Sequence, residues 1–377
     1  MLVFNYIALF IILITLVFLY NRFLSHQKSY WGTDEYEGLR EILLNKNNIK
    51  DDHRPILWIY VPYQYNSRHW ESFGSRSSHD LNQPYLYMTV KSIINHCDRS
   101  FNICIIDDDS FGKLIPDWSI DMTKISNPIK ENMVHLGIAR LIYLYGGMVV
   151  PISFLCIKDL YELYEKGTKN NSMFVCEAYN ENVSSSSQNL YFANTNFMGA
   201  CKENTTMKRY IEFIQITISS DYTDQSIFIG EINRWCNERI GSRYMNLIPG
   251  IQIGTKAFDN TPILIETLLS NDVVNFYDNM YGIWIPSEMV LKRRHYEWFS
   301  RMSPEQIIDS DFILAKYFVI ALAPQDNSMH MKKHRSDPDW VNFWRVPLTN
   351  GTLNIYGLKP LFLGNNVPVA TNTGNAN

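Results

Sequence analysis

The stretch LIYLYGGMVVPISFLCIKDL, Leu141–Leu160, decides the fold class. An apolar run at helical spacing stops at Gly146 and Gly147, and glycine commonly ends a helix. A second apolar run follows with the branched residues of a buried strand. This strand carries no acidic side chain before Asp159. The stretch therefore predicts a helix leading straight into a strand that brings no carboxylate to its end.

The same alternation covers much of the chain. Strands are predicted at RPILWIYVPY, FNICIID, SMFVCEAY and YFANTNFMGA, and helices at YLYMTVKSIINHC, ENMVHLGIARLIYLY and TTMKRYIEFIQITI. MVVPISFLCI is predicted as one extended piece, with Pro151 near its end at an irregular or edge position because proline lacks a backbone donor. From Asp221 the pattern is mixed, with a helix at QSIFIGEINRWCNERI and strand and turn character at YGIWIPSEMVL. The sequence thus predicts an α/β sheet with crossover connections.

Composition narrows the functional class. The 377 residues suffice for one large domain or two, and the 46% hydrophobic content indicates a folded body. A formal charge of -4 argues against a nucleic-acid partner. The six cysteines show no CxxC and no dense framework, which favours free buried thiols in a reducing compartment and no thiolate metal site.

The N-terminal run MLVFNYIALFIILITLVFLY, residues 1–20, holds no charge and has the length that crosses a bilayer. It lacks the basic start of a cleaved signal peptide, so we expect a retained signal-anchor. Arg22 and Lys28 follow the run, whereas no basic residue precedes it. Because positive charge near a span stays cytosolic, the body is expected on the cytosolic side of the membrane.

The expected domain organisation has four parts. Residues 1–20 form the transmembrane anchor, and residues 21–54 form a polar stalk. Residues 55–365 form the α/β domain, and residues 366–377 form a polar, disordered tail.

Within residues 55–215, the chain resembles the capsular-polysaccharide-synthesis and family 32 glycosyltransferases. The stretches that carry the resemblance are ILWIYVP, FNICIIDDDSFGKLIPDW, HLGIARLIYLYGGMVVPISFL and NLYFANTNFMGACKENTTMKRYIEFI. The family has Ser-Asp-x-x-Arg, then Leu-Tyr-x-Tyr-Gly-Gly, then a strand ending in Asp-x-Asp or Asp-x-Thr. Matching residues here are Arg140, Leu144, Tyr145, Gly146 and Gly147. The resemblance implies the GT-A fold, a Rossmann-like mixed sheet flanked by helices. It also implies that Arg140, Tyr145, Gly146 and Gly147 are the remnant of a nucleotide-sugar site.

The family's chemistry depends on acids that this chain lacks. A divalent cation, Mn or Mg, is held by carboxylates and takes up the charge of the leaving diphosphate. The two acid positions fall on Pro151 and Ser153, and the acid three residues before Arg140 falls on Gly137. Loss of metal stabilisation worth several kcal/mol costs on the order of a thousandfold in rate. The resemblance therefore implies a degenerate site with no bound metal and no cofactor.

A competing acidic pair lies in IIDDDS. Asp107 and Asp109 form Asp-x-Asp at the end of a predicted strand, where ligands often bind in open α/β sheets. The resembling families also carry an acidic turn here, ahead of their metal motif. Asp107 and Asp109 are therefore either a solvated turn leading into the next helix or a weak candidate for catalytic metal ligands.

Two functions follow as hypotheses. In the first, the domain is a pseudoenzyme that acts as a structural protein fixed to a membrane through residues 1–20, with other proteins as partners. One setting is a large DNA virus, where a minor capsid protein would link the internal membrane of the virion to capsid proteins; a cellular pseudoenzyme is the other setting. In the alternative, the chain is an active membrane-bound glycosyltransferase that uses a nucleotide sugar with Mn or Mg.

Overall fold

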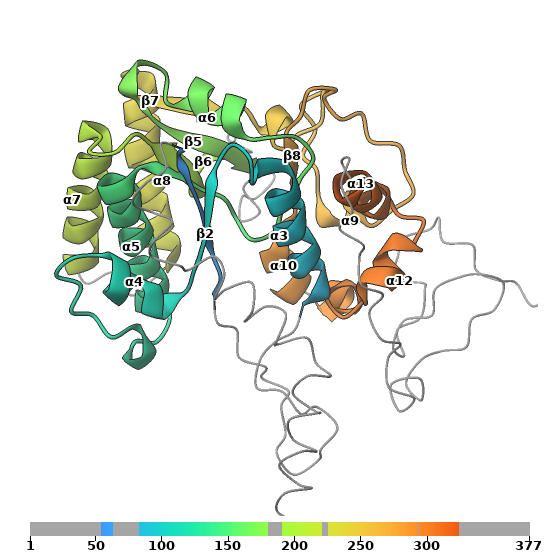
Figure 1. Cartoon of the computed structure of the whole chain (residues 1–377), viewed down its shortest axis with the longest axis horizontal. Coiled ribbons are helices and arrows are strands. Elements are labelled where there is room, and N and C mark those ends of the chain that lie inside the picture. Colours follow the sequence, from blue (N-terminus) through green and yellow to red (C-terminus); the bar gives the residue numbers. More distant parts are fainter. Residues whose placement is uncertain (1–53, 63–82, 180–190, 221–224, 293, 324–377) are drawn as a thin grey trace, which may run out of the picture. The chain divides into compact units, whose positions relative to one another are not determined.

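The computed structural model describes residues 54–62, 83–179, 191–220, 225–292 and 294–323. Strands and helices alternate along these residues and build an α/β fold with a mixed six-stranded sheet flanked by helices (Figure 1). The predicted α/β class is thereby confirmed.

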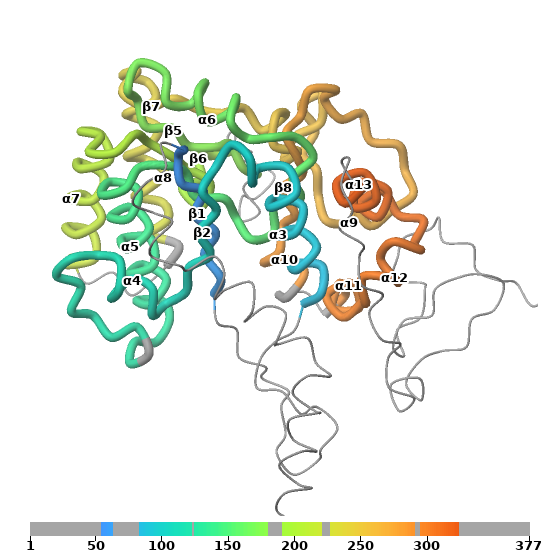
Figure 2. Tube along the Cα trace, viewed as in Figure 1, coloured from blue at the N-terminus to red at the C-terminus, as the bar shows by residue number. Residues whose placement is uncertain are grey.

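Six strands form the main sheet in the order β2-β1-β3-β6-β5-β7. β1 pairs in parallel with β2 and β3, β6 runs antiparallel to β3 and β5, and β7 is parallel to β5. Every strand of the main sheet except β6 therefore points the same way, and Figure 2 shows β1 and β2 side by side. The bounds are β1 Ile56–Tyr60, β2 Asn102–Ile106, β3 Gly147–Val149, β5 Met173–Tyr179, β6 Tyr191–Ala200 and β7 Met245–Ile248.

Helices connect and cover these strands. α5 contacts α7, and α7 contacts α8, while α6 contacts β5, β6 and β7. The first group of α-helices is α3 Pro84–Cys97, α4 Asp108–Leu114, α5 Ile129–Tyr145, α6 Tyr161–Gly167, α7 Thr205–Ser219 and α8 Gln225–Gly241. The short 3-10 helices are η2 Met122–Lys124, η3 Lys169–Asn171, η4 Gly250–Gln252 and η5 Arg294–Tyr296.

The junction between α5 and β3 depends on two glycines. α5 ends at Tyr145, and Gly146 follows with φ 77° and Gly147 with φ 95°, a region that side chains other than glycine's rarely adopt. A Cβ atom on Gly147 would lie 1.9 Å from the carbonyl oxygen of Ile56 in β1. The Gly-Gly pair thus permits both the turn and the close approach of β3 to β1.

The prediction of one extended piece over MVVPISFLCI is wrong. It forms two short strands, β3 in the main sheet and β4 Phe154–Cys156, which pairs with β8 Gly282–Trp284 in a separate two-stranded sheet. The turn contains Pro151, and the amide of Phe154 donates to the carbonyl of Pro151 at 3.0 Å. Proline at this point interrupts strand pairing, so the chain changes sheets.

The region after β7 builds a second hydrophobic cluster around α3, β4 and β8. Tyr85, Leu155, Ile283, Phe299 and Phe318 are buried members of this cluster. The α-helices of this region are α9 Ile265–Leu268, α10 Ser287–Lys292, α11 Glu297–Ser300, α12 Pro304–Ile308 and α13 Ile313–Leu322. Mixed helix and strand character from Asp221 onward was predicted, but the packing of this region on α3 was not.

Several predictions fall outside the described residues: the anchor at 1–20, nearly all of the stalk at 21–54 and the tail at 366–377. Among the helices of the described ranges, none combines the length and the apolar character needed to cross a bilayer. All six cysteines lie in the described ranges and are free, and the sulfur atoms of Cys97 and Cys156 are 3.8 Å apart.

Candidate functional site

The candidate site is the edge of the sheet where β1, β2 and β3 end. These strands are parallel, so their carboxyl ends meet there, and ligands of open α/β sheets bind at this kind of edge. Tyr60 and Ile106, the last residues of β1 and β2, are register partners. The residues that follow the three strands therefore decide what this edge can bind.

Asp107 directly follows β2 and caps α4. Its carboxylate accepts a hydrogen bond from the amide of Ser110 at 3.0 Å, and the Ser110 hydroxyl accepts one from the amide of Asp107 at 3.1 Å. This reciprocal capping box satisfies two backbone donors at the helix start. The Asp107 carboxylate thus has a structural partner on its own helix.

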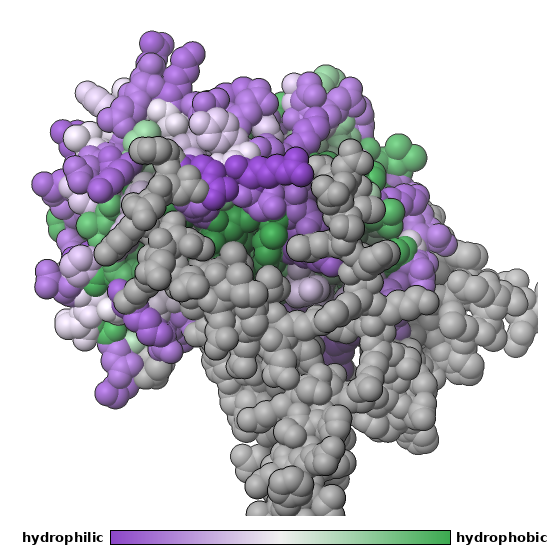
Figure 3. All heavy atoms as spheres, in the orientation of Figure 1, coloured by the Kyte–Doolittle hydropathy of each residue, from purple (hydrophilic) through white to green (hydrophobic). Residues whose placement is uncertain are grey.

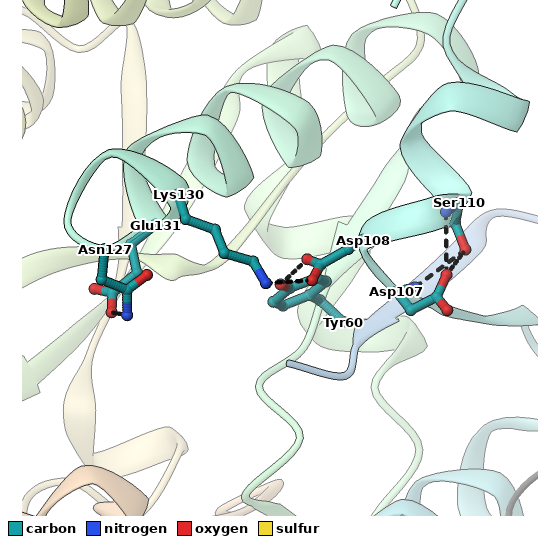
Figure 4. Close-up of polar contacts among 7 residues, drawn as sticks. All are labelled: Tyr60, Asp107, Asp108, Ser110, Asn127, Lys130 and Glu131. Carbon is teal, nitrogen blue, oxygen red and sulfur yellow. Dashed lines mark hydrogen bonds and ion pairs between the residues drawn. The ribbon is translucent and has the colours of Figure 1, made fainter. Parts of the chain in front are cut away.

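Asp108 is the centre of a polar cluster with Tyr60 and Lys130 (Figure 4). The Tyr60 hydroxyl donates to one carboxylate oxygen at 2.7 Å, and the Lys130 ammonium lies 2.6 Å from the other. The side chains of Lys130 and Asp108 are 23% and 13% exposed. Burial, reinforced by the Asp108 carboxylate, raises the pKa of Tyr60 well above its usual range. The cluster ties β1, α4 and α5 together.

Asp109 and Arg140 have different surroundings in the described residues. Asp109 is exposed on the first turn of α4. The guanidinium of Arg140 lies 6.0 Å from the ring centroid of Trp118, in cation–π range, and no ion pair joins it to an acid within the described ranges. Within the described residues, Arg140 therefore makes no ion pair with Asp107 or Asp109.

The segment that follows β3 is held from two sides. Thr89 of α3 donates its hydroxyl to the carbonyl of Ile152 at 2.6 Å. Ser153 is 2% exposed, and its hydroxyl donates to the carbonyl of Ile285 at 2.8 Å. The amide of Ile285 donates back to the carbonyl of Ser153 at 3.2 Å. Pro151 offers no side-chain ligand, and Ser153 offers only a neutral, buried hydroxyl that donates to Ile285, so neither position presents a carboxylate to a cation.

The first acid after β3, Asp159, serves another helix. Its carboxylate accepts from the amide of Tyr161 at 3.1 Å, at the start of α6, and also from the hydroxyl of Ser100. Asp159 therefore does not replace the acids missing at 151 and 153.

The position of Gly137 on α5 is filled by an aromatic ring. A Cβ atom on Gly137 would lie 2.7 Å from ring carbons of Phe111, which is fully buried on α4. The Phe111 ring also stacks on Tyr60 with centroids 5.9 Å apart. Space that an acidic side chain would need at 137 is thus occupied by packing between α4 and α5.

Tyr145 and the following glycines make structural contacts. The Tyr145 hydroxyl donates to the carbonyl of Leu114 at the end of α4, at 2.7 Å. The indole of Trp58 in β1 donates to the carbonyl of Gly146 at 3.0 Å and lies against the Tyr145 ring. Tyr145 and Gly146, which match the family pattern, therefore connect α4, α5 and β1 through hydrogen bonds.

Sequence reasoning missed three residues that form hydrogen bonds or ion pairs at this edge, namely Tyr60, Thr89 and Lys130. Tyr60 could have been identified from the sequence, because it is a polar-tipped residue at the end of a predicted strand, where ligands of α/β sheets bind. Thr89 and Lys130 carry no local signal because their partners come from other elements.

Within the described ranges, no group of three or more His, Cys, Asp or Glu side chains is placed to hold a metal ion.

His135 of α5 was also missed. Its ring centroid lies 6.0 Å from that of Phe228 in α8, and burial lowers the pKa of His135 to about 4, against a smaller opposing effect of Glu288. This histidine is therefore neutral at physiological pH.

Comparisons with known proteins find distant structural similarity to glycosyltransferases. No protein-family model and no curated protein matches the sequence. The apo-form glycosyltransferase GlyE of Streptococcus pneumoniae aligns over 53% of this chain and 46% of its own, with 8% identity and a TM-score of 0.32. An active-site mutant of LgtC aligns over 47% of this chain and 70% of its own, with 12% identity and a TM-score of 0.27. The galactosyltransferase LgtC in complex with donor and acceptor sugar analogues covers the same shares, with 11% identity and a TM-score of 0.26. This chain thus spans less than half of GlyE.

Proposed function

We propose that this chain is a glycosyltransferase-like domain without metal-dependent transferase activity, and that it serves as a membrane-anchored structural protein. The observation that carries the proposal is the segment after β3. There the resembling family supplies metal-binding acids, whereas this chain has Pro151 and a buried Ser153 whose hydroxyl donates to Ile285. Carboxylate oxygens hold Mg²⁺ or Mn²⁺ in that family, whereas proline offers no side-chain ligand and serine only a neutral, weak one.

The neighbouring acids support the same proposal. Asp107 caps α4, and Asp108 is bound by Tyr60 and Lys130. Recruiting either carboxylate to a cation would remove a helix cap or break a partly buried ion pair. Gly137 supports the proposal as well. The resembling family has an acid at this position, and here the Phe111 ring occupies the space that its side chain would need.

Calorimetry on the full-length chain tests the loss of activity. The chain in detergent micelles is titrated with UDP-glucose, UDP-galactose and GDP-mannose in the presence of Mn²⁺, and release of the sugar is followed in parallel. We expect no Mn²⁺-dependent binding heat and no turnover. Turnover that depends on Mn²⁺ and disappears in an Asp107→Asn, Asp109→Asn variant would instead establish the active membrane-bound transferase.

The membrane role is proposed on the sequence of residues 1–20, with the body on the cytosolic side. The full-length chain should float with lipid vesicles after a high-salt wash, whereas a variant lacking residues 1–28 should stay in the soluble fraction. Flotation of that variant would contradict a single N-terminal anchor.

The partners proposed for this structural role are other proteins, with capsid proteins of a large DNA virus as the specific case. In that case the chain would link the inner membrane of the virion to its capsid. Cross-linking mass spectrometry on purified virions would detect such a contact as cross-links between this chain and a capsid protein.

A further inference from the structure

Among the described residues, the strand β7 ends the main sheet and has one unpaired edge. Within the described ranges it pairs only with β5, and Figure 1 shows it at the margin of the sheet beside α6. Successive side chains of a strand point to opposite faces. The Asn246 amide donates to the carbonyl of Gly167 in α6 at 2.8 Å, so Met245 and Leu247 face the other side, toward α8. An unpaired edge of this kind presents backbone donors and acceptors to any extended chain.

Two hollows adjoin β7 and each other. The α8-side hollow, about 570 Å³, is bordered by the starts of α7 and β7, the end of α8, and residues 170–172. The α6-side hollow, about 310 Å³, is bordered by Lys166, Lys169, Gln252 and residues 246–249. Both hollows share Asn170, Asn246 and Leu247. A strand added to this edge would therefore lie beside both hollows, and side-chain pockets next to an added strand are how strand addition gains specificity.

The charged residues that line the two hollows are all basic. Lys166, Lys169 and Arg243 contribute to their lining, and no acidic residue does. Lys166 pairs with Glu162 at 2.7 Å, but neither Lys169 nor Arg243 makes an ion pair within the described ranges. In Figure 3 the surface over β7 and α6 is predominantly hydrophilic. An acidic ligand is the complement of this surface.

Arg243 occupies a position where helices normally have glycine. The amide of Arg243 donates to the carbonyl of Ile240, and the amide of Tyr244 donates to that of Arg239, both at 3.0 Å. This is the Schellman pattern, and its left-handed residue is Arg243 with φ 62°. Glycine would adopt this conformation without steric cost. The chain instead carries an exposed cation at the border of the α8-side hollow.

We propose that the free edge of β7 is a docking site for an extended acidic segment of a partner protein. The segment adds to the sheet as a further strand, and its carboxylates pair with Lys169 and Arg243 at the borders of the two hollows. At roughly 3.3 Å per residue, the edge accommodates about four or five ligand residues. This interaction does not depend on whether the domain transfers sugars.

The test uses the full-length chain and a short fluorescent peptide of alternating Glu and Thr. Fluorescence anisotropy should show binding of this peptide, and hydrogen exchange should show increased protection of residues 244–249 when it is bound. A peptide of alternating Lys and Thr should not bind. The Glu-Thr peptide N-methylated at every residue should also fail, because it lacks the backbone donors for strand pairing.

Arg243→Gly separates binding from folding. This variant removes the cation and relieves the left-handed strain, so it should melt at or above the parent's temperature while its affinity for the Glu-Thr peptide falls about tenfold or more. Arg234→Gln, an exposed change on α8 outside both hollows, should bind like the parent. Lys169→Gln should weaken binding in the same direction as Arg243→Gly.

Three results would overturn the proposal. The first is no binding of the Glu-Thr peptide, and the second is equal binding of its N-methylated or lysine counterpart. The third is full protection of residues 244–249 in the unliganded chain, because the edge would then be covered by this chain itself or by a second copy.

Discussion

Gly137 and Phe111 show how the absence of a side chain permits close packing between two helices. The Cβ position of Gly137 lies 2.7 Å from the Phe111 ring, and that ring also stacks on Tyr60. The absence of a side chain at 137 therefore lets α4 pack closely on α5. A carboxylate at this position would have to displace a fully buried aromatic ring.

Gly137→Asp should destabilise the protein by about 3 kcal/mol or more, because it overpacks the α4–α5 contact and buries a carboxylate. Gly230→Asp is the matched control, since Gly230 is an exposed residue of α8 with nothing within 4 Å of its Cβ position. Urea denaturation of both variants checks this. Equal midpoints would show that Phe111 does not fill the site.

Ser153→Asp should also destabilise the fold, by about 2–4 kcal/mol. The buried serine donates to the Ile285 carbonyl, and an ionised aspartate would oppose that oxygen with a second acceptor. Ser153→Ala is the control, and it should cost only about 1 kcal/mol for one lost hydrogen bond. Thermal melts with and without Mn²⁺ provide the measurement. A Mn²⁺-dependent rise in the melting temperature of Ser153→Asp would reveal a latent metal site.

At the scale of elements, the α5–β3 junction fixes the centre of the sheet. Gly146 and Gly147 both have positive φ, and β3 passes so close to β1 that only glycine fits at 147. The turn containing Pro151 then sends the chain from the main sheet into the β4–β8 pair. One short stretch thus joins the two sheets, and its glycines are required by the fold.

Gly147→Ala should prevent accumulation of folded protein, because its Cβ atom would lie 1.9 Å from the Ile56 carbonyl oxygen. Gly241→Ala is the control, since Gly241 ends α8 with open space around its Cβ position. The control should be neutral or stabilising by up to about 1 kcal/mol. Soluble yield and circular dichroism report the outcome. A Gly147→Ala protein that folds like the parent would be incompatible with this close approach.

At the scale of the whole molecule, buried tyrosines make stability depend on alkaline pH. Burial raises the pKa of Tyr60, Tyr85 and Tyr210 above the usual value. Above about pH 10, the unfolded chain releases these protons while the folded protein keeps them. Unfolding is thereby favoured, so the free energy of unfolding falls as pH rises, by up to about 1.4 kcal/mol per pH unit for each such tyrosine.

Tyr85→Phe should reduce this alkaline loss. The Tyr85 hydroxyl is buried and has no hydrogen-bond partner within the described ranges, so its removal should leave stability at pH 7 unchanged or increased. Denaturation midpoints measured between pH 8 and about 11.5 should fall less steeply in this variant than in the parent. Tyr244→Phe, at an exposed position, is the control and should follow the parent. If the midpoints of Tyr85→Phe and the parent fell equally steeply with pH, ionisation of Tyr85 would not contribute to the alkaline loss of stability.

The sequence by itself determined the local features of this protein. Periodicity placed α3, α5 and α7, branched and aromatic runs placed β1, β2, β5 and β6, and the Gly-Gly pair placed the end of α5. Such features depend on neighbours along the chain, so they can be read from a short window. The lack of acids at 137, 151 and 153 is likewise a property of the sequence alone.

Only the tertiary structure decided what surrounds those positions. Phe111 against Gly137, Ile285 against Ser153, and Lys130 against Asp108 each join residues from different elements. The split of MVVPISFLCI between two sheets also depended on β8, which lies far along the chain. Close packing and hydrogen bonding between distant segments set these contacts, and no local sequence pattern encodes which partners will meet.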